Sequence, residues 1–511
     1  MPETLQQSVP QRDRNLTSGR LLARNTVFNL VGSLLPMVVA LICVPLIIRG
    51  LGTDRFGILT LAWAVIGYAS IFDLGLGRAL TKLVAEQLGK EEQDDVCALV
   101  WTSLLLMLAL GLGGALLMGI LSPWLVHRTL RIPPCLQPES LESFYLLAVS
   151  VPIVVVSAGL RGLLQALQRF DLLNAIGIPS GILSFASPLL VLLLTKSLVA
   201  VVAVLVGLDL AGCVACLLFC LRAMPDLARG VAWQRSRVAP LLRFGGWMTV
   251  SNVVNPLMVT SDRFLIGSLV SIAAVAYYAT PYEIITKLWI IPGSLVCVLF
   301  PALTTSFVQN IDRTAVLFGK SLKFIFLSLF PATLIIVAFS GRGLTLWLGA
   351  EFARRGEHVL QWLAVGVFIN SLAHVPFALV QGVGRPDLTA KLHLLELPCY
   401  ILVLWYLTRR YGIDGAAVAW VLRVSVDTLL LFLLSTRVLR SVGKTLGQLG
   451  ASVVAALLIF GLTILPMALT AKVIFVSSVL LALAAIAWFV IVSPDERAIL
   501  QWSSEGSDLA K

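Results

Sequence analysis

Long apolar runs, separated by short polar segments, repeat along most of the chain. About 20 consecutive apolar residues suffice for an α-helix to cross the ~30 Å hydrocarbon core of a membrane. The pattern therefore predicts an all-α polytopic membrane protein. About fourteen transmembrane helices are predicted, at residues 26–48, 56–75, 97–122, 143–165, 172–195, 198–221, 244–268, 274–305, 318–340, 358–380, 388–408, 414–436, 447–467 and 472–493.

One predicted helical hairpin, residues 241–310, carries ionisable side chains inside its apolar runs. Asp262 and Arg263 lie near the end of the first run, and Glu283 and Lys287 lie in the second. Each would cost roughly 2.5 to 3.5 kcal/mol at the centre of a helix that faces lipid. We therefore expect these side chains to face a protein interior or a wet cavity.

Residues 24–87 repeat the plan of this hairpin, with a polar lead-in, an apolar run, a short turn and a second run. Pro36 corresponds to Pro256 at an offset of 220 residues, and 79–81 correspond to 302–304 at an offset of 223. The shared pattern predicts two structural repeats, a common plan among transporters. The predicted parts are a cytoplasmic N-terminal segment at 1–23, a six-helix bundle at 24–221, a basic linker at 222–243, a second six-helix bundle at 244–440, two additional transmembrane helices at 441–494 and a cytoplasmic tail at 495–511.

The composition agrees with a membrane protein, because 58% of the residues are hydrophobic and only 13% are charged. The net charge of +11 could indicate a nucleic-acid partner. However, with a cytoplasmic N-terminus, the cytoplasmic loops hold roughly twice as many Lys and Arg residues as the outer loops, as the positive-inside rule requires. Arg161 and Arg169 are assigned to one such cytoplasmic loop. Topology and contact with anionic lipids thus account for the charge, nucleic-acid binding is excluded, and both termini are predicted to be cytoplasmic in a multi-pass inner-membrane protein.

Short motifs occur in a characteristic order along the first twelve spans. They are Ile48-Arg49-Gly50-Leu51-Gly52 with Phe56-Gly57, Asp73-Leu74-Gly75-Leu76, Arg243-Phe244-Gly245-Gly246-Trp247, Asp262-Arg263-Phe264-Leu265-Ile266-Gly267, Tyr277-Tyr278 and Phe300-Pro301-Ala302. In this order they resemble the polysaccharide transporter family of the multidrug/oligosaccharidyl-lipid/polysaccharide exporter superfamily. This Wzx-like branch flips undecaprenyl-linked O-antigen or exopolysaccharide repeat units.

The resemblance implies two six-helix bundles that face each other across a central cavity and alternate between inward-open and outward-open forms. It also implies a cationic lumen for the pyrophosphate and sugar head group, because a charged head group in a low-dielectric cavity needs charge-assisted donors. The candidate substrate-binding residues are Arg24 and Arg49, where family members often carry basic residues, together with Arg263, Lys287 and Arg423, which lie within spans.

The same charges have a structural interpretation. Asp262 with Arg263, Glu283 with Lys287, and Asp427 with Arg423 could neutralise one another in pairs. Alternatively, a carboxylate could mediate ion coupling, and the candidates for coupling or pairing are Asp73, Asp209, Asp262, Glu283 and Asp427. A proton relay through Glu396 or Asp427 is a further possibility, and His393 lies in the same span as Glu396. Asp73 could instead cap a loop, and Asp209 could be a buried, hydrogen-bonded carboxylate.

No nucleotide-driven motor or enzyme is predicted. Gly319-Lys320-Ser321 resembles the end of a phosphate-binding loop, but Thr314 replaces the first glycine. The outer loops are short, and neither a metal site nor a cofactor is predicted. The predicted function is a flippase for a polyprenyl-pyrophosphate-linked oligosaccharide, with membrane lipids and polysaccharide polymerase machinery as partners. The alternatives are a lipid II-type peptidoglycan precursor flippase, a drug/cation antiporter of the same superfamily, and an integral-membrane glycosyltransferase or polymerase.

Overall fold

The computed structural model describes residues 19–89, 93–167, 169–235, 238, 257–439, 443–486 and 488. All regular structure in these ranges is helical. Among the described residues, nine helices are long and apolar enough to cross a membrane. Helices satisfy their own backbone hydrogen bonds, which a bilayer interior demands because it contains no water. The prediction of an all-α polytopic membrane protein is confirmed.

The chain divides into two compact units, one made of residues up to 260 with 271–276 and the other of 261–270 with the residues from 277 onward. The helices of the first unit are α2 (Gly19–Leu51), α3 (Thr53–Tyr68), η1 (Ala69–Asp73), α4 (Leu76–Gly89), α5 (Gln93–Trp124), η2 (Leu125–Thr129), η3 (Pro134–Leu136), α6 (Gln137–Ala166), α7 (Phe170–Leu192), α8 (Leu198–Ala223) and η4 (Pro225–Arg229). The predicted boundaries of the two bundles and of the linker stay a prediction.

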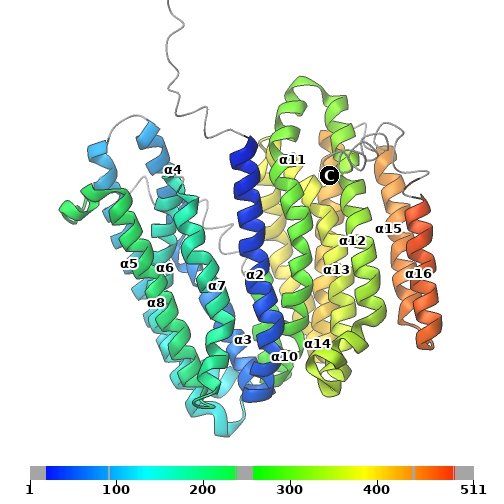
Figure 1. The fold of residues 1–511 in the computed structure, drawn as a ribbon, viewed down its shortest axis with the longest axis horizontal. Helices are drawn as coiled ribbons and strands as arrows, with labels where there is room; N and C mark the ends of the chain where they lie inside the picture. Colours follow the sequence, from blue (N-terminus) through cyan, green and yellow to red (C-terminus); the bar gives the residue numbers. More distant parts are fainter. Residues whose placement is uncertain are drawn as a thin grey trace, which may run out of the picture. The chain divides into compact units, whose positions relative to one another are not determined.

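A group of packed long helices forms the core of the first unit. In Figure 1, α5, α6, α7 and α8 run side by side, with α6 against both α5 and α8. Val151 and Val155 on α6 are fully buried. On α5, Leu112, Leu116 and Ile120 are 56%, 67% and 67% exposed at a spacing of four residues. This spacing places them on one face of the helix, which is apolar enough to contact lipid.

Two of the sequence motifs form tight turns in this unit. Gly52 connects α2 to α3 with φ 81°. After η1, Leu74 (φ 49°) and Gly75 (φ 76°) adopt left-handed conformations, and the Gly75 amide donates to Asp73 Oδ1 at 2.7 Å. Glycine adopts positive φ without a steric penalty, and Asp stabilises such turns with its side chain. The turn conformations therefore explain why glycine and aspartate occur at these motif positions.

The second unit contains helical residues 261–269, most of α10 (Ile272–Ile285) and the helices that follow it, which are η5 (Thr286–Trp289), α11 (Ile290–Gln309), α12 (Ile311–Leu348), α13 (Ala350–Gly382), α14 (Pro386–Val438), α15 (Gly443–Ile464) and α16 (Leu469–Ile486). The sequence predicts one span at 274–305, but a short 3-10 segment, η5, separates α10 from α11. Tighter 3-10 turns inside a helical run often mark a hinge or a local strain.

Two of the long helices in this unit change direction. α12 has non-helical backbone angles at Phe339 (φ −113°, ψ 15°), and the freed carbonyl of Ala338 accepts from Lys472 Nζ on α16 at 3.1 Å. α14 is interrupted at Gly412 (φ 63°, ψ −139°). The interruption separates the two predicted spans 388–408 and 414–436, so α14 consists of two arms.

Candidate functional site

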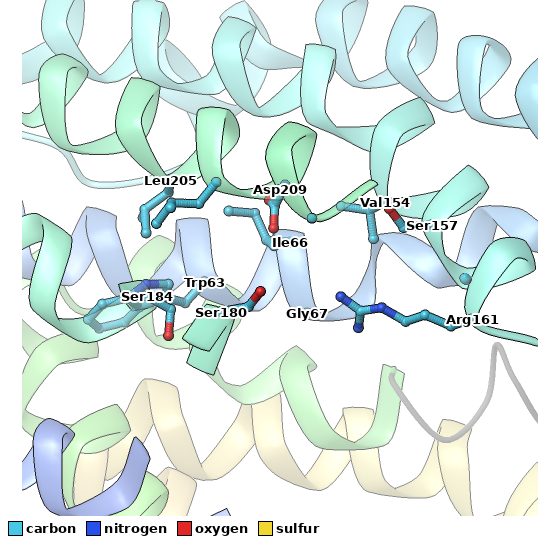
Figure 2. Close-up of a pocket in the computed structure, with 13 residues that line it drawn as sticks. Trp63, Ile66, Gly67, Val154, Ser157, Arg161, Ser180, Ser184, Leu205 and Asp209 are labelled. Atoms are coloured by element: carbon cyan, nitrogen blue, oxygen red, sulfur yellow. The ribbon is translucent and has the colours of Figure 1, made fainter. Parts of the chain in front are cut away.

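A cavity of about 400 Å³ lies within the first unit, between α3, α6, α7 and α8. Its lining residues combine apolar, aromatic, hydroxyl and charged side chains, and they are Trp63, Ile66, Gly67, Val154, Ser157, Ala158, Arg161, Ser180, Ser184, Leu205, Leu208, Asp209 and Gly212. Figure 2 shows the Asp209 carboxylate and the Arg161 guanidinium directed into this space from α8 and α6. We name it the N-terminal cavity. Its volume lies in the range of small-molecule sites, about 300 to 1,000 Å³.

Two residues of the N-terminal cavity hold a buried polar atom that has no hydrogen-bond partner among the described residues. These atoms are Trp63 Nε1, which is a donor, and Asp209 Oδ2, which is an acceptor. Arg161 is the opposing charge that acts on Asp209. Buried polar groups are almost always paired, and an unpaired one at a cavity wall indicates a ligand or water in that cavity. The cavity thus offers a donor, an acceptor and a cation to a bound molecule.

The ring of Trp63 is held in place by its aromatic neighbours. Its centroid lies 5.3 Å from that of Phe185 and 6.0 Å from that of Phe56, in tilted and edge-on arrangements. Such packing restricts the rotamers of a large side chain. The indole nitrogen therefore occupies a defined position in the wall of the cavity, while Ser180 and Ser184 add hydroxyl groups from α7.

The ionisable residues of the second predicted hairpin form a local network inside the second unit. Asp262 is fully buried and accepts from Tyr278 Oη at 2.7 Å and from the Arg263 amide at 2.7 Å. The guanidinium of Arg263 forms an ion pair with Glu283 and lies 5.5 Å from the centroid of the Tyr282 ring. Asp262 is thus held by two hydrogen bonds, and the guanidinium of its neighbour Arg263 forms its ion pair with Glu283 while it also acts electrostatically on Asp262.

The pairing at Glu283 and Lys287 is looser. Lys287 Nζ lies 4.0 Å from Glu283 Oε2, and both side chains are about half exposed. Arg263, by contrast, is 4% exposed and its Nε has no hydrogen-bond partner within the described part of the chain. Of these two basic residues, Lys287 is therefore the more accessible to a substrate, and Arg263 is held in place by burial and by its ion pair with Glu283.

The charges of α14 are arranged differently from the predicted Arg423–Asp427 pair. Asp427 Oδ1 lies 3.5 Å from His393 Nε2, and no ion pair joins Asp427 to Arg423 in the described residues. The guanidinium of Arg423 lies 5.6 Å from the centroid of the Tyr400 ring. The helical spacing of four residues therefore does not produce the expected contact.

The remaining predicted residues lie apart from the N-terminal cavity lining. Asp73 caps the turn after η1, which matches its structural interpretation. Arg49 is exposed in the last turn of α2. Arg24 lies in α2, but its side chain is outside the described residues, as are Arg243–Trp247 of the quoted motif and Pro256.

Sequence reasoning missed Arg161 and Trp63, the two other side chains on which the argument for the N-terminal cavity depends. Arg161 was expected in a cytoplasmic loop, but α6 continues to Ala166 and places it inside the helix. The one feature of the sequence that could have identified Arg161 is its position within the predicted span 143–165. Trp63 carried no signal, because an aromatic residue in an apolar run is typical of core packing. Asp209, which was predicted from its isolation in an apolar span, does line the cavity.

Comparison with known proteins supports the resemblance drawn from the motifs. A family described as polysaccharide biosynthesis protein matches residues 22–307, more than half of the chain. A Shigella flexneri protein assigned as an O-antigen transporter is 32% identical over 422 residues, which cover 81% of this chain and 98% of that protein. The lipopolysaccharide biosynthesis protein WzxC of Escherichia coli (strain K12) is 23% identical over 202 residues, covering 39% of this chain and 41% of WzxC.

Solved structures share the fold at low sequence identity. An inward-facing multidrug resistance transporter of the MATE family matches with a TM-score of 0.69 and 16% identity, over 81% of this chain and 99% of its own. The lipid II flippase MurJ in an inward closed conformation matches with a TM-score of 0.67 and 11% identity, over 92% of this chain and all of its own. The chain is a multi-pass membrane protein with the fold of these transporters, and it belongs to the polysaccharide biosynthesis protein family.

Proposed function

We propose that the chain translocates an undecaprenyl-pyrophosphate-linked oligosaccharide across the bacterial inner membrane. The observation that carries this proposal is the N-terminal cavity, in which an unpaired donor, an unpaired acceptor and a guanidinium line one space. A sugar hydroxyl both donates and accepts hydrogen bonds, so it can satisfy Trp63 Nε1 and Asp209 Oδ2. Arg161 supplies a charge-assisted donor for an anionic group such as a phosphate or an acidic sugar.

The relatives support the same substrate class, since one is assigned as an O-antigen transporter and another acts in lipopolysaccharide biosynthesis. In this proposal, both termini are cytoplasmic and two repeated bundles alternate in access, while the polyprenyl tail stays in lipid. The flipped repeat unit is then taken by polysaccharide polymerase machinery. Arg24, Arg49, Arg263, Lys287 and Arg423 are proposed to add positive charge along the route.

The free energy for transport comes from an ion gradient, the membrane potential or consumption of the product. A potential contributes about 2.3 kcal/mol per charge per 100 mV. Among the carboxylates proposed for coupling, Asp209 and Asp427 each have a buried oxygen that accepts no hydrogen bond in the described structure. Asp73 and Asp262 accept backbone or tyrosine hydrogen bonds, and we assign them structural roles.

The test is leaflet exchange of a fluorescent undecaprenyl-pyrophosphate oligosaccharide in liposomes that contain the purified protein. We expect protein-dependent exchange that Asp209→Asn and Arg161→Gln lower strongly, because each removes a charged group from the cavity wall. Arg169→Gln is the matched control, since Arg169 pairs with Asp171 at an exposed site outside the cavity. It is expected to exchange lipid at the wild-type rate.

Three outcomes would contradict the proposal. Exchange of lipid II in place of the other oligosaccharides would indicate a peptidoglycan precursor flippase. Cation-linked efflux of a dye without any lipid exchange would indicate a drug antiporter. Glycosyl transfer that a single carboxylate substitution abolishes would indicate an enzyme.

A further inference from the structure

Three ligand-forming side chains from separate parts of α14 meet in the second unit. His393 and Glu396 lie in its first arm, and Asp427 lies in the second. In a straight helix, Glu396 and Asp427 would be about 46 Å apart. The reversal at Gly412 instead brings one ligand atom of each side chain within 4.8 Å of the others. We name these three residues the α14 triad.

The spacing within the α14 triad is close to that of a metal centre. The His393 Nε2 and Asp427 Oδ1 atoms are 3.5 Å apart. Two ligands of a tetrahedral Zn²⁺ ion, each at about 2.1 Å from the metal, lie about 3.4 Å apart. The Glu396 ligand atom lies within 4.8 Å of the other two, so a rotation of its side chain that moves this atom by at most about 1.4 Å gives the same separation.

Burial leaves the carboxylates of the triad in need of a partner. Glu396 is 8% exposed, and neither of its carboxylate oxygens has a hydrogen-bond partner in the described residues. Asp427 is 4% exposed, and its Oδ1 likewise has no hydrogen-bond partner there. An ionised carboxylate that is buried without a partner is strongly unfavourable, and coordination of a metal ion is one of the ways in which proteins satisfy it.

The charge balance favours a divalent ion. When both carboxylates are ionised and His393 is neutral, the triad carries two negative charges, which a divalent cation compensates. Arg423 acts electrostatically on Glu396, but it lies over the ring of Tyr400 and makes no ion pair with either carboxylate in the described structure. The His393 side chain is 23% exposed and stacks on Phe377, so the triad keeps one accessible ligand.

We propose that the α14 triad binds a divalent transition-metal ion of the Zn²⁺ type and thereby ties the two arms of α14 together. One imidazole nitrogen with two carboxylate oxygens is a donor set for zinc and its neighbours, and the imidazole disfavours Mg²⁺ and Ca²⁺, which prefer oxygen ligands only. The inference goes beyond transport and is independent of the substrate.

The test uses the full-length protein in detergent, purified through a histidine-free tag and stripped of metal with a chelator. Calorimetric titration with Zn²⁺ is expected to show one site per chain, and Zn²⁺ is expected to raise the unfolding temperature because it binds only the folded state. Glu396→Gln and His393→Asn should weaken Zn²⁺ binding by about 100-fold or more. Mg²⁺ should not compete.

Two variants serve as matched controls, because each removes an exposed side chain of the same chemical type. Asp387→Asn changes a carboxylate at the start of α14 that pairs with Arg385 and Lys391. His358→Asn changes an exposed imidazole on α13. Both should bind Zn²⁺ like the wild type.

Absence of Zn²⁺ binding by the wild type would overturn the proposal, as would full binding by Glu396→Gln. Equal affinity for Mg²⁺ would overturn the assignment to transition metals. If Glu396→Gln fails to fold, His393→Asn, which changes a partly exposed side chain, still decides the question.

Discussion

At the scale of single residues, burial and hydrogen bonding separate the carboxylates that the sequence left equivalent. Asp262 is fully buried with two donors, whereas Asp209 keeps one oxygen unpaired at a cavity wall. A buried carboxylate with its donors in place contributes to a unique fold, and one without them is available to a ligand. The hydrogen-bond partners of each carboxylate thus distinguish a structural role from a ligand-binding role, which composition and spacing could not do.

The hydrogen bond from Tyr278 to Asp262 gives a prediction at this scale. Tyr278→Phe leaves Asp262 Oδ2 buried without that donor, and we expect a loss of about 1 to 3 kcal/mol in the free energy of unfolding. Tyr400→Phe is the matched control, because the Tyr400 hydroxyl is buried without a hydrogen-bond partner in the described residues. The measurement is denaturant unfolding in detergent, and equal stability of the two variants would contradict the assignment.

At the scale of elements, a close backbone contact joins α3 to the start of α10. A Cβ at Gly57 on α3 would lie 2.0 Å from the carbonyl oxygen of Ile272. Real Cβ atoms do not approach an oxygen so closely, so position 57 requires a glycine. The Phe56-Gly57 motif therefore has a packing explanation inside the first unit.

We predict that Gly57→Ala destabilises the protein by about 1 to 3 kcal/mol or more, because the added methyl group must displace backbone. Gly113→Ala on α5 is the control, since a Cβ there meets no atom within 4 Å. Alanine is also the better helix former, by about 1 kcal/mol. Thermal unfolding in detergent compares the two variants, and an unchanged unfolding temperature for Gly57→Ala would refute the packing explanation.

At the scale of the whole molecule, we predict that the last two helices are additions to a core that precedes them. α15 and α16 pack against α12, and Lys472 bonds to the carbonyl group at the kink of α12. The Shigella flexneri relative is matched over 98% of its length by 81% of this chain. About a fifth of the chain thus lies outside the part that aligns with this relative.

We therefore predict that a chain ending at residue 442 inserts into the membrane and retains most of the oligosaccharide-lipid exchange. A chain ending at residue 382 also loses α14, which packs against α13, and should not yield a folded protein. Size-exclusion chromatography and the liposome exchange assay measure both properties. Loss of monodisperse protein on truncation at 442 would show that α15 and α16 are part of the core.

The sequence by itself determined the class of the protein and most of its helices. Long apolar runs leave no alternative to membrane helices, because only internally bonded segments are stable in lipid. The turn motifs could also be recognised from the sequence. Gly52 and Gly75 adopt positive φ angles that few other residues tolerate, and the Asp73 side chain stabilises the turn at Gly75. Asp209 could be singled out because an isolated carboxylate in an apolar span is costly.

Only the tertiary structure decided which side chains meet. Spacing along one helix predicted Arg423 beside Asp427, but the reversal at Gly412 brings His393 there from 34 positions earlier in the chain. Arg161 and Asp209 face the N-terminal cavity from two different helices, and Trp63 joins them from a third. Periodicity describes the faces of a single helix, whereas a site is formed by the packing of several, which depends on the crossing and kinking of helices far apart in sequence.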